Sequence, residues 1–239
     1  MTDREQIESR IVHDKLKTDA VMRPENGEIV IPHKALPYML DLYKHMKDYV
    51  KLTDADMDTA CMIYMFLADD FTFIPYLPLA VECYMSALKC ASQSEDETLM
   101  GEIPELVYKI AKFRNIIARD RFYANNACLV QNTGNPENRV YDACEDIDTN
   151  GKITAAQIRE LVNAAAETAC RTLIASATEH TDEYLHLIYD MNESVFSNFS
   201  EEQKNDENFC HAYWAAKKMY LKSKGMKWET PAKLNPKLH

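Results

Sequence analysis

The sequence predicts an all-α fold built from helix–loop–helix repeats. Ala, Leu, Met, Glu and Lys are common, whereas Gly occurs 5 times and Pro 9 times, a bias that favours helices over β-sandwiches. Apolar residues make up 46% of the 239 residues, which is enough for a packed core. Apolar side chains recur at helical spacing along the chain, without the alternation of strands and helices that is typical of α/β enzymes.

Five helical segments are expected in the first half of the chain, separated by polar or β-like stretches. They cover residues 3–18, 33–52, 53–68, 78–90 and 104–123. The first is indicated by the stripe Ile7, Ile11, Val12 and Leu16. Thr53 is expected to cap the third helix, because its hydroxyl can accept a hydrogen bond from a free backbone N–H group. The stretches NGEIVI and FTFI are predicted to form short β-like cores.

The second half is expected to begin with a linker, NTGNPEN, at residues 132–138. Four further helices are predicted at residues 136–145, 155–176, 182–196 and 207–223. The closing residues read as an irregular tail.

One loop carries a motif that predicts chemistry. Residues 146–157 read DIDTNGKITAAQ, and an amphipathic helix follows them with Ile158, Leu161, Val162 and Ala165 on one face. The pattern D-x-D-x-N-G-x-I resembles the twelve-residue loop of the EF-hand family. The resemblance implies a tight turn at Gly151, and it implies that Ile153 pairs with a neighbouring loop. It also implies a set of metal ligands: Asp146, Asp148, Asn150, Lys152 through its carbonyl, Thr154 and Gln157.

Two positions depart from the family pattern. Glu145 precedes the loop where the family usually has an aromatic or aliphatic residue, and Gln157 replaces the closing glutamate. Because Gln offers one neutral oxygen in place of two charged ones, we expect calcium to bind at least about tenfold more weakly than at sensor sites, near about 10⁻⁴ M. The implied cofactor is therefore weakly held Ca²⁺, or Mg²⁺ in its place.

The resemblance implies two EF-hand pairs joined by a helical connector, with only one recognisable loop. The expected segments are a degenerate pair at 1–95, a connector at 96–134, the pair with the calcium loop at 135–223, and a basic tail at 224–239. Two other candidate loops lack the ligand set: NGEI at 26–29 and the segment 67–78. A third set, Asp190, Asn192, Ser194, Asn198 and Glu201, falls on ligand positions. A helical stripe passes through that third set, so a helix is predicted there.

Several functional classes are disfavoured by the sequence. No apolar run is long enough to span a membrane, and the charged N-terminal residues do not match a secretory signal. The 7 cysteines contain no CxxC pair, which predicts structural thiols in a cytoplasmic protein. No phosphate-binding, nucleophile or zinc-protease motif is present, so no enzyme is expected.

The charge is unevenly distributed. The chain carries −11, yet from Lys217 onward 7 lysines face a single acid, Glu229. An acidic body disfavours nucleic acid and favours basic partners. Two functions are left open, and a small-molecule carrier with an aromatic-lined interior is a more distant third. The first is a non-catalytic EF-hand protein that binds calcium weakly and also a protein partner, through a basic or amphipathic helix in a groove, or through an acidic surface on its Lys-rich tail. The alternative is a calcium-independent adaptor subunit of a larger, cytoskeletal assembly.

Overall fold

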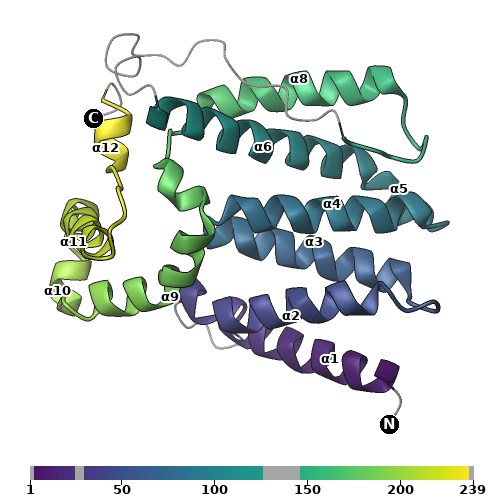
Figure 1. The fold of residues 1–239 in the computed structure, drawn as a ribbon, viewed down its shortest axis with the longest axis horizontal. Helices are drawn as coiled ribbons and strands as arrows, with labels where there is room; N and C mark the ends of the chain where they lie inside the picture. Colours follow the sequence, from purple (N-terminus) through teal and green to yellow (C-terminus); the bar gives the residue numbers. More distant parts are fainter. Residues whose placement is uncertain (1–2, 25–29, 126–145, 237–239) are drawn as a thin grey trace. The chain divides into compact units, whose positions relative to one another are not determined.

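The computed structural model describes residues 3–24, 30–125 and 146–236 (Figure 1). Every regular element in these ranges is a helix, which confirms the all-α class. None of the described helices is long and apolar enough to cross a membrane. The predicted linker 132–138, the predicted helix 136–145 and the NGEI stretch lie outside the described residues. The arrangement as two EF-hand pairs stays a prediction.

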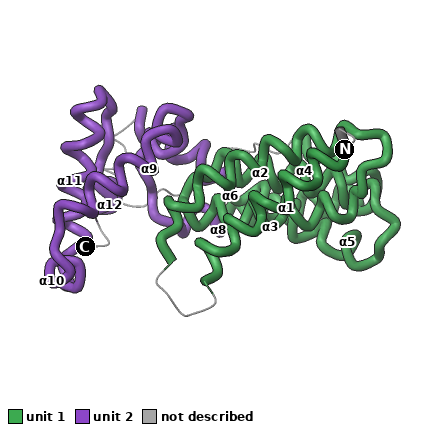
Figure 2. Tube along the Cα trace, turned by 90° about the horizontal axis from the view of Figure 1, so that it is seen from below, with its two compact units in different colours: residues 1–114, 142–167 green, residues 115–141, 168–239 purple. Residues whose placement is uncertain are grey.

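The chain divides into two compact units, coloured separately in Figure 2. Unit 1 comprises residues 1–114 and 142–167, and unit 2 comprises residues 115–141 and 168–239. Two long helices, α6 (Ile103–Asn125) and α8 (Ala155–Arg171), contribute residues to both units. The predicted segment 1–95 lies in unit 1, whereas 135–223 is shared between the units.

Unit 1 contains two helix pairs, α1 with α2 and α3 with α4, whose members lie side by side (Figure 1). Besides its parts of α6 and α8, unit 1 contains α1 (Asp3–Met22), η1 (Pro32–Lys34), α2 (Leu36–Tyr49), α3 (Met57–Phe73), α4 (Leu77–Gln93) and α5 (Glu97–Gly101). The α3–α4 pair forms the centre of the core: Tyr64, Leu67, Tyr84 and Leu88 are each at most 1% exposed. Burial of such apolar surface is the main driving force for this packing.

Two local predictions in unit 1 are wrong. Asp56, and not Thr53, caps α3: its carboxylate accepts hydrogen bonds from the N–H groups of Asp58 at 3.0 Å and Thr59 at 3.2 Å. The FTFI stretch is not β-like, because Phe71 to Phe73 form the last turn of α3. Phe71 is 0% exposed, so helix packing overrides the local β propensity of its aromatic and β-branched neighbours.

Unit 2 is formed by shorter helices. They are η2 (Ala177–His180), α9 (Asp182–Phe196), α10 (Glu201–Lys204), α11 (Phe209–Ser223) and α12 (Pro231–Leu234). The predicted helix 182–196 is confirmed, and it runs through the degenerate ligand set that starts at Asp190. Thr181 caps it by accepting a hydrogen bond from Tyr184 N–H at 3.3 Å.

The described part of the segment after α11 is irregular apart from the short helix α12, and it packs against other residues of unit 2. Trp228 is 3% exposed, and its indole N–H donates to Glu179 at 2.7 Å. The same carboxylate oxygen accepts from Lys217 Nζ at 2.7 Å, while this ammonium lies 4.5 Å from the centre of the Trp228 ring. The indole hydrogen bond and the cation–π contact of Trp228 thus fasten the segment to unit 2.

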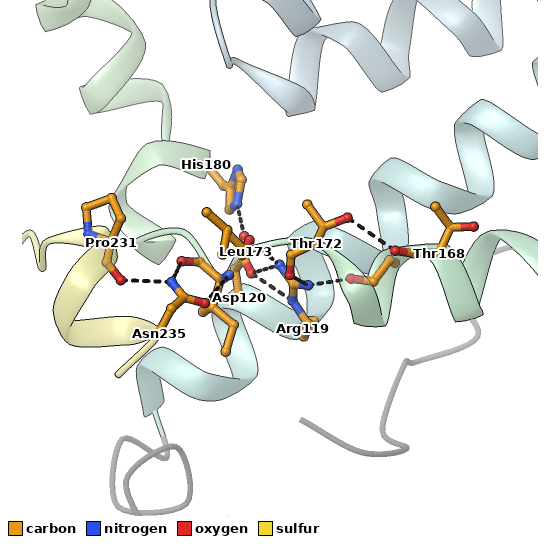
Figure 3. Close-up of polar contacts among 10 residues, drawn as sticks. Arg119, Asp120, Thr168, Thr172, Leu173, His180, Pro231 and Asn235 are labelled. Atoms are coloured by element: carbon orange, nitrogen blue, oxygen red, sulfur yellow. Dashed lines mark hydrogen bonds and ion pairs between the residues drawn. The ribbon is translucent and has the colours of Figure 1, made fainter. Parts of the chain in front are cut away.

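Other residues of the segment are also engaged. Glu229 pairs with Lys218 at 2.7 Å and with Lys233 at 2.9 Å. The Asn235 side chain is buried and exchanges two hydrogen bonds with the backbone of Ile174, at 2.9 and 2.8 Å (Figure 3). The lysines of this segment are therefore partly neutralised within the protein, which weakens the prediction that they recognise an acidic surface.

A buried polar cluster joins three parts of unit 2 (Figure 3). Arg119 on α6 is 1% exposed, and Asp120 beside it is 0% exposed. The Asp120 carboxylate accepts from Arg119 at 2.7 Å and lies 2.9 Å from Nε2 of His180, which is also buried. Arg119 donates in addition to the carbonyl of Ala169 in the last turn of α8 and to those of Thr172 and Leu173 just after it. It supplies hydrogen bonds that a helix C-terminus otherwise lacks.

The five described cysteines are free thiols, and Cys128 and Cys144 lie outside the described residues. Burial raises the pKa of the Cys61 thiol to about 12 and that of Cys90 to about 11. The reactive thiolate is then scarce at pH 8. We expect iodoacetamide to modify exposed Cys210 well before Cys61 or Cys90 in the folded protein, as mapped by peptide mass spectrometry. Modification of Cys61 at the rate of Cys210 would contradict the α3–α4 packing.

Candidate functional site

The loop 146–157 contains the tight turn that the sequence predicted. Gly151 has φ +74°, and Asn150 before it has φ +52°. Glycine adopts this left-handed region without steric cost, and Asn tolerates it better than most residues. The Asp148 carboxylate accepts a hydrogen bond from Asn150 N–H at 2.8 Å, which stabilises the turn.

The first predicted ligand is held by a cation of the protein itself. Both carboxylate oxygens of Asp146 accept from the guanidinium of Arg114 on α6, one of them at 2.9 Å. The pKa of Asp146 is lowered, chiefly by this hydrogen bond from Arg114. A bidentate arginine–carboxylate pair is among the stronger hydrogen-bonded ion pairs, although the Asp146 side chain is 64% exposed and water screens the attraction.

Two further predicted ligand residues direct their side chains to the end of α4. Asn150 donates from its amide nitrogen to the carbonyl of Ser92 at 3.2 Å, and Lys152 donates from Nζ to the carbonyl of Ser94 at 3.4 Å. These carbonyls lie in the last turn and at the C-cap of α4, where helical partners are missing. The loop thereby caps α4.

The last two predicted ligands bond to each other at the start of α8. Gln157 Oε1 accepts from the N–H and the hydroxyl of Thr154, both at 2.9 Å, and Gln157 N–H donates to Thr154 Oγ1 at 3.3 Å. This reciprocal arrangement is a capping box. The glutamine that replaces the family's glutamate thus has a structural partner.

These groups fit a calcium ion poorly in this arrangement. A calcium site needs six to eight oxygens that converge without a competing cation, whereas Asp146 is neutralised by Arg114 and Gln157 is engaged in the cap. Among the described residues, no group of three or more His, Cys, Asp or Glu side chains is placed to hold a metal. Ile153 lies in a bend and is half-buried. Calcium binding by this loop stays a prediction.

A second candidate site is a groove between α1 and α3, with a cavity volume of about 700 Å³. It is lined by Arg4, Glu8, Ile11, Val12, Lys15, Tyr49, Asp56, Thr59, Met62, Ile63 and Phe66. Val12 is 58% exposed and Met62 is 55% exposed, and Leu16 continues the apolar face on α1 at 64%. Helix α2 covers only part of the apolar stripe on α1, so the rest faces the groove.

Two ion pairs flank this groove, one at the start of α1 and one just after its end. Arg4 near the start of α1 bonds to Asp54, and Arg23 just after α1 pairs with Asp70 on α3 at 2.8 Å. Arg23 also lies 3.8 Å from the centre of the Phe66 ring. The α1 residues that line the groove run from Arg4 to Lys15, a distance of about 16 Å along a helix. The groove is therefore long enough for about three turns of a bound helix.

Methionines of unit 1 lie both in the core and in the groove. Met39 and Met46 are 0% exposed and belong to the core, as expected for ordinary helical packing. Met62 instead lines the groove, where a soft, unbranched side chain can adapt to different partners.

Comparison with known proteins identifies no relative of this chain. No protein-family model, curated protein sequence or solved structure matches the chain.

Sequence reasoning missed two features of these sites. Arg114 lies 32 residues from Asp146, and nothing in the local pattern of either segment indicates that they meet. The groove carried a weak signal, because the stripe Ile7, Ile11, Val12 and Leu16 is more apolar than one helical neighbour requires.

Proposed function

We propose that the protein is a non-catalytic adaptor that binds an amphipathic helix of a partner protein in the α1–α3 groove, without needing calcium. The observation that supports this most is the exposed apolar surface of the groove, where the lining residues Val12 and Met62 are each more than half exposed, and Leu16 extends this surface along α1. Grooves of this kind take up helices whose apolar residues recur at i, i+3, i+4 and i+7. Exposed apolar surface in a groove is a mark of interaction sites.

Charge favours a basic partner. Unit 1 holds 26 Asp and Glu against 15 Lys and Arg, a net of −11, whereas unit 2 has 12 of each and is neutral. The charges that line the groove balance one another, so basic residues flanking the bound helix would interact with the wider surface of unit 1. Such long-range attraction raises association rates and weakens with salt.

Calcium independence is supported by the state of the loop, in which Asp146, Asn150 and Gln157 already have protein partners. The competing candidate, an EF-hand protein with a weak calcium site, is favoured by one observation, the left-handed turn at Asn150 and Gly151. Weak binding at one site would also supply little free energy for a conformational switch. The adaptor is therefore preferred.

The test uses the full chain and a synthetic 18-residue peptide with leucines at helical spacing and lysines elsewhere. In a fluorescence anisotropy titration we expect it to bind at least about tenfold more tightly than a scrambled peptide of the same composition. The affinity should be the same in chelator and in 1 mM calcium, and it should fall as salt is raised. Equal binding of the scrambled peptide would contradict the groove, and a requirement for calcium would favour the EF-hand sensor.

A further inference from the structure

The loop 146–157 has a local charge balance of its own. Its two carboxylates, Asp146 and Asp148, are accompanied by one cation within the loop, Lys152, and one that reaches in from α6, Arg114. The Arg114 side chain is only 18% exposed, so the guanidinium is largely withdrawn from water and directed at the loop. Its N–H groups satisfy both oxygens of the residue at which a metal-binding loop of this pattern would begin.

The Arg114 side chain also restrains the position of the loop. Arg114 connects the start of the loop to α6, while Asn150 and Lys152 connect its centre to the end of α4. Ile147 and Thr149 alternate with the polar positions and are 8% and 3% exposed. Three side chains, those of Arg114, Asn150 and Lys152, thus fix the loop. A divalent cation could bind to Asp146 only if the ion pair between Asp146 and Arg114 were broken.

We infer that the guanidinium of Arg114 serves as the resident cation of the 146–157 loop in place of a divalent metal, and that its removal creates a divalent-cation site. Two aspartates and the oxygens of Asn150 and Thr154 would remain around the turn at Gly151. Without Arg114 the two carboxylates have no partner from α6, and their mutual repulsion is relieved by a hard cation. This inference concerns the loop alone and is independent of partner binding in the groove.

The expected change in affinity follows from Coulomb repulsion between a divalent ion and a guanidinium a few ångströms away. Removing that repulsion should tighten calcium binding by about tenfold or more, even when solvent screening is strong. The loss of the ion pair should at the same time lower the unfolding temperature of the calcium-free protein by about 2–4 °C.

The experiment compares the wild-type chain with Arg114→Gln, and with Arg159→Gln as the matched control. Arg159 is an exposed arginine on α8 of unit 1, so its loss changes the net charge equally. Calcium chloride is titrated calorimetrically from about 10 µM to 1 mM, the range between sensor and weak sites, and thermal unfolding is followed with and without 1 mM calcium. We expect measurable binding and a calcium-dependent rise in unfolding temperature only for Arg114→Gln.

Two outcomes would overturn the inference. One is wild-type affinity equal to or tighter than that of Arg114→Gln, and the other is an equal gain in Arg159→Gln. Adding Asp146→Asn to Arg114→Gln should abolish the gain, which separates a site at the loop from adventitious binding elsewhere. If Arg114→Gln does not fold, the exchanged pair Arg114→Asp with Asp146→Arg tests the ion pair between positions 114 and 146 directly. Recovery of folding in the exchanged pair supports the inference, and failure to recover it counts against it.

Discussion

Replacing Arg119 by methionine is expected to destabilise unit 2 by about 3–5 kcal/mol, because the change leaves the buried Asp120 carboxylate without its cation and α8 without a cap. Arg119 is 1% exposed and contacts Asp120 together with three backbone carbonyls. The methionine side chain is of similar length, so the loss of charge and of donors, and not an empty volume, dominates the effect.

The chain offers a specific readout for this variant. Both tryptophans, Trp214 and Trp228, lie in unit 2, so the shift of tryptophan fluorescence in urea reports the unfolding of that unit. The matched control is Arg121→Met on the same helix, where an exposed arginine donates a hydrogen bond to the carbonyl of His180 at 3.1 Å. Its cost should stay below about 1 kcal/mol. Equal effects of the two variants would show that the buried cluster does not stabilise unit 2.

Replacing Met62 by glutamate is expected to weaken binding of the basic amphipathic peptide by about 30-fold or more. A helix seated in the α1–α3 groove would have to bury the new carboxylate among Ile11, Ile63 and Phe66, and burying an unpaired charge costs more than about 2 kcal/mol. The fold should change little, because Met62 is 55% exposed and surface substitutions usually stay within about 0.5 kcal/mol.

Met219→Glu provides the comparison. Met219 on α11 of unit 2 is 74% exposed, and its substitution adds the same charge outside the groove. We expect peptide affinity to remain within about threefold of the wild-type value, as screened charge effects allow. If both variants weaken binding equally, the peptide recognises net charge and the groove is not its site. Circular dichroism of each variant verifies that the helices are intact.

The helices could be predicted because their apolar stripes are local. The stripe Tyr184, Leu187, Ile188, Met191 and Val195 predicts residues 182–196, and α9 has those bounds. Local signals failed where tertiary packing decides, as at Phe71, whose aromatic neighbourhood suggests a strand and whose burial against α4 makes a helix. Capping was misplaced by three residues, because several polar residues before α3 could each supply the oxygen.

For the loop 146–157, the sequence predicted the backbone turn but not the residues that contact the loop. The glycine at 151 predicts the left-handed turn, since few residues adopt that conformation. Arg114 and the end of α4 approach the loop only in the folded chain, from 32 to 58 residues away in sequence. The buried cluster of Arg119, Asp120 and His180 did leave a usable signal in the sequence. Asp120 lies at helical spacing from Ile116 and Tyr123, which places a charged residue on the buried face of α6.

The passage of α6 and α8 through both units has a consequence for the order of folding during synthesis. Residues 115–141 of unit 2 separate the two sequence segments of unit 1, residues 1–114 and 142–167. At about 5–20 residues per second, a ribosome needs several seconds to deliver the 53 residues between 114 and 167. During that interval the end of α4 lacks the loop residues Asn150 and Lys152, whose side chains donate hydrogen bonds to its last carbonyls. A nascent chain stalled after residue 125 should therefore be a good substrate for chaperones, and one stalled well beyond residue 167 should not.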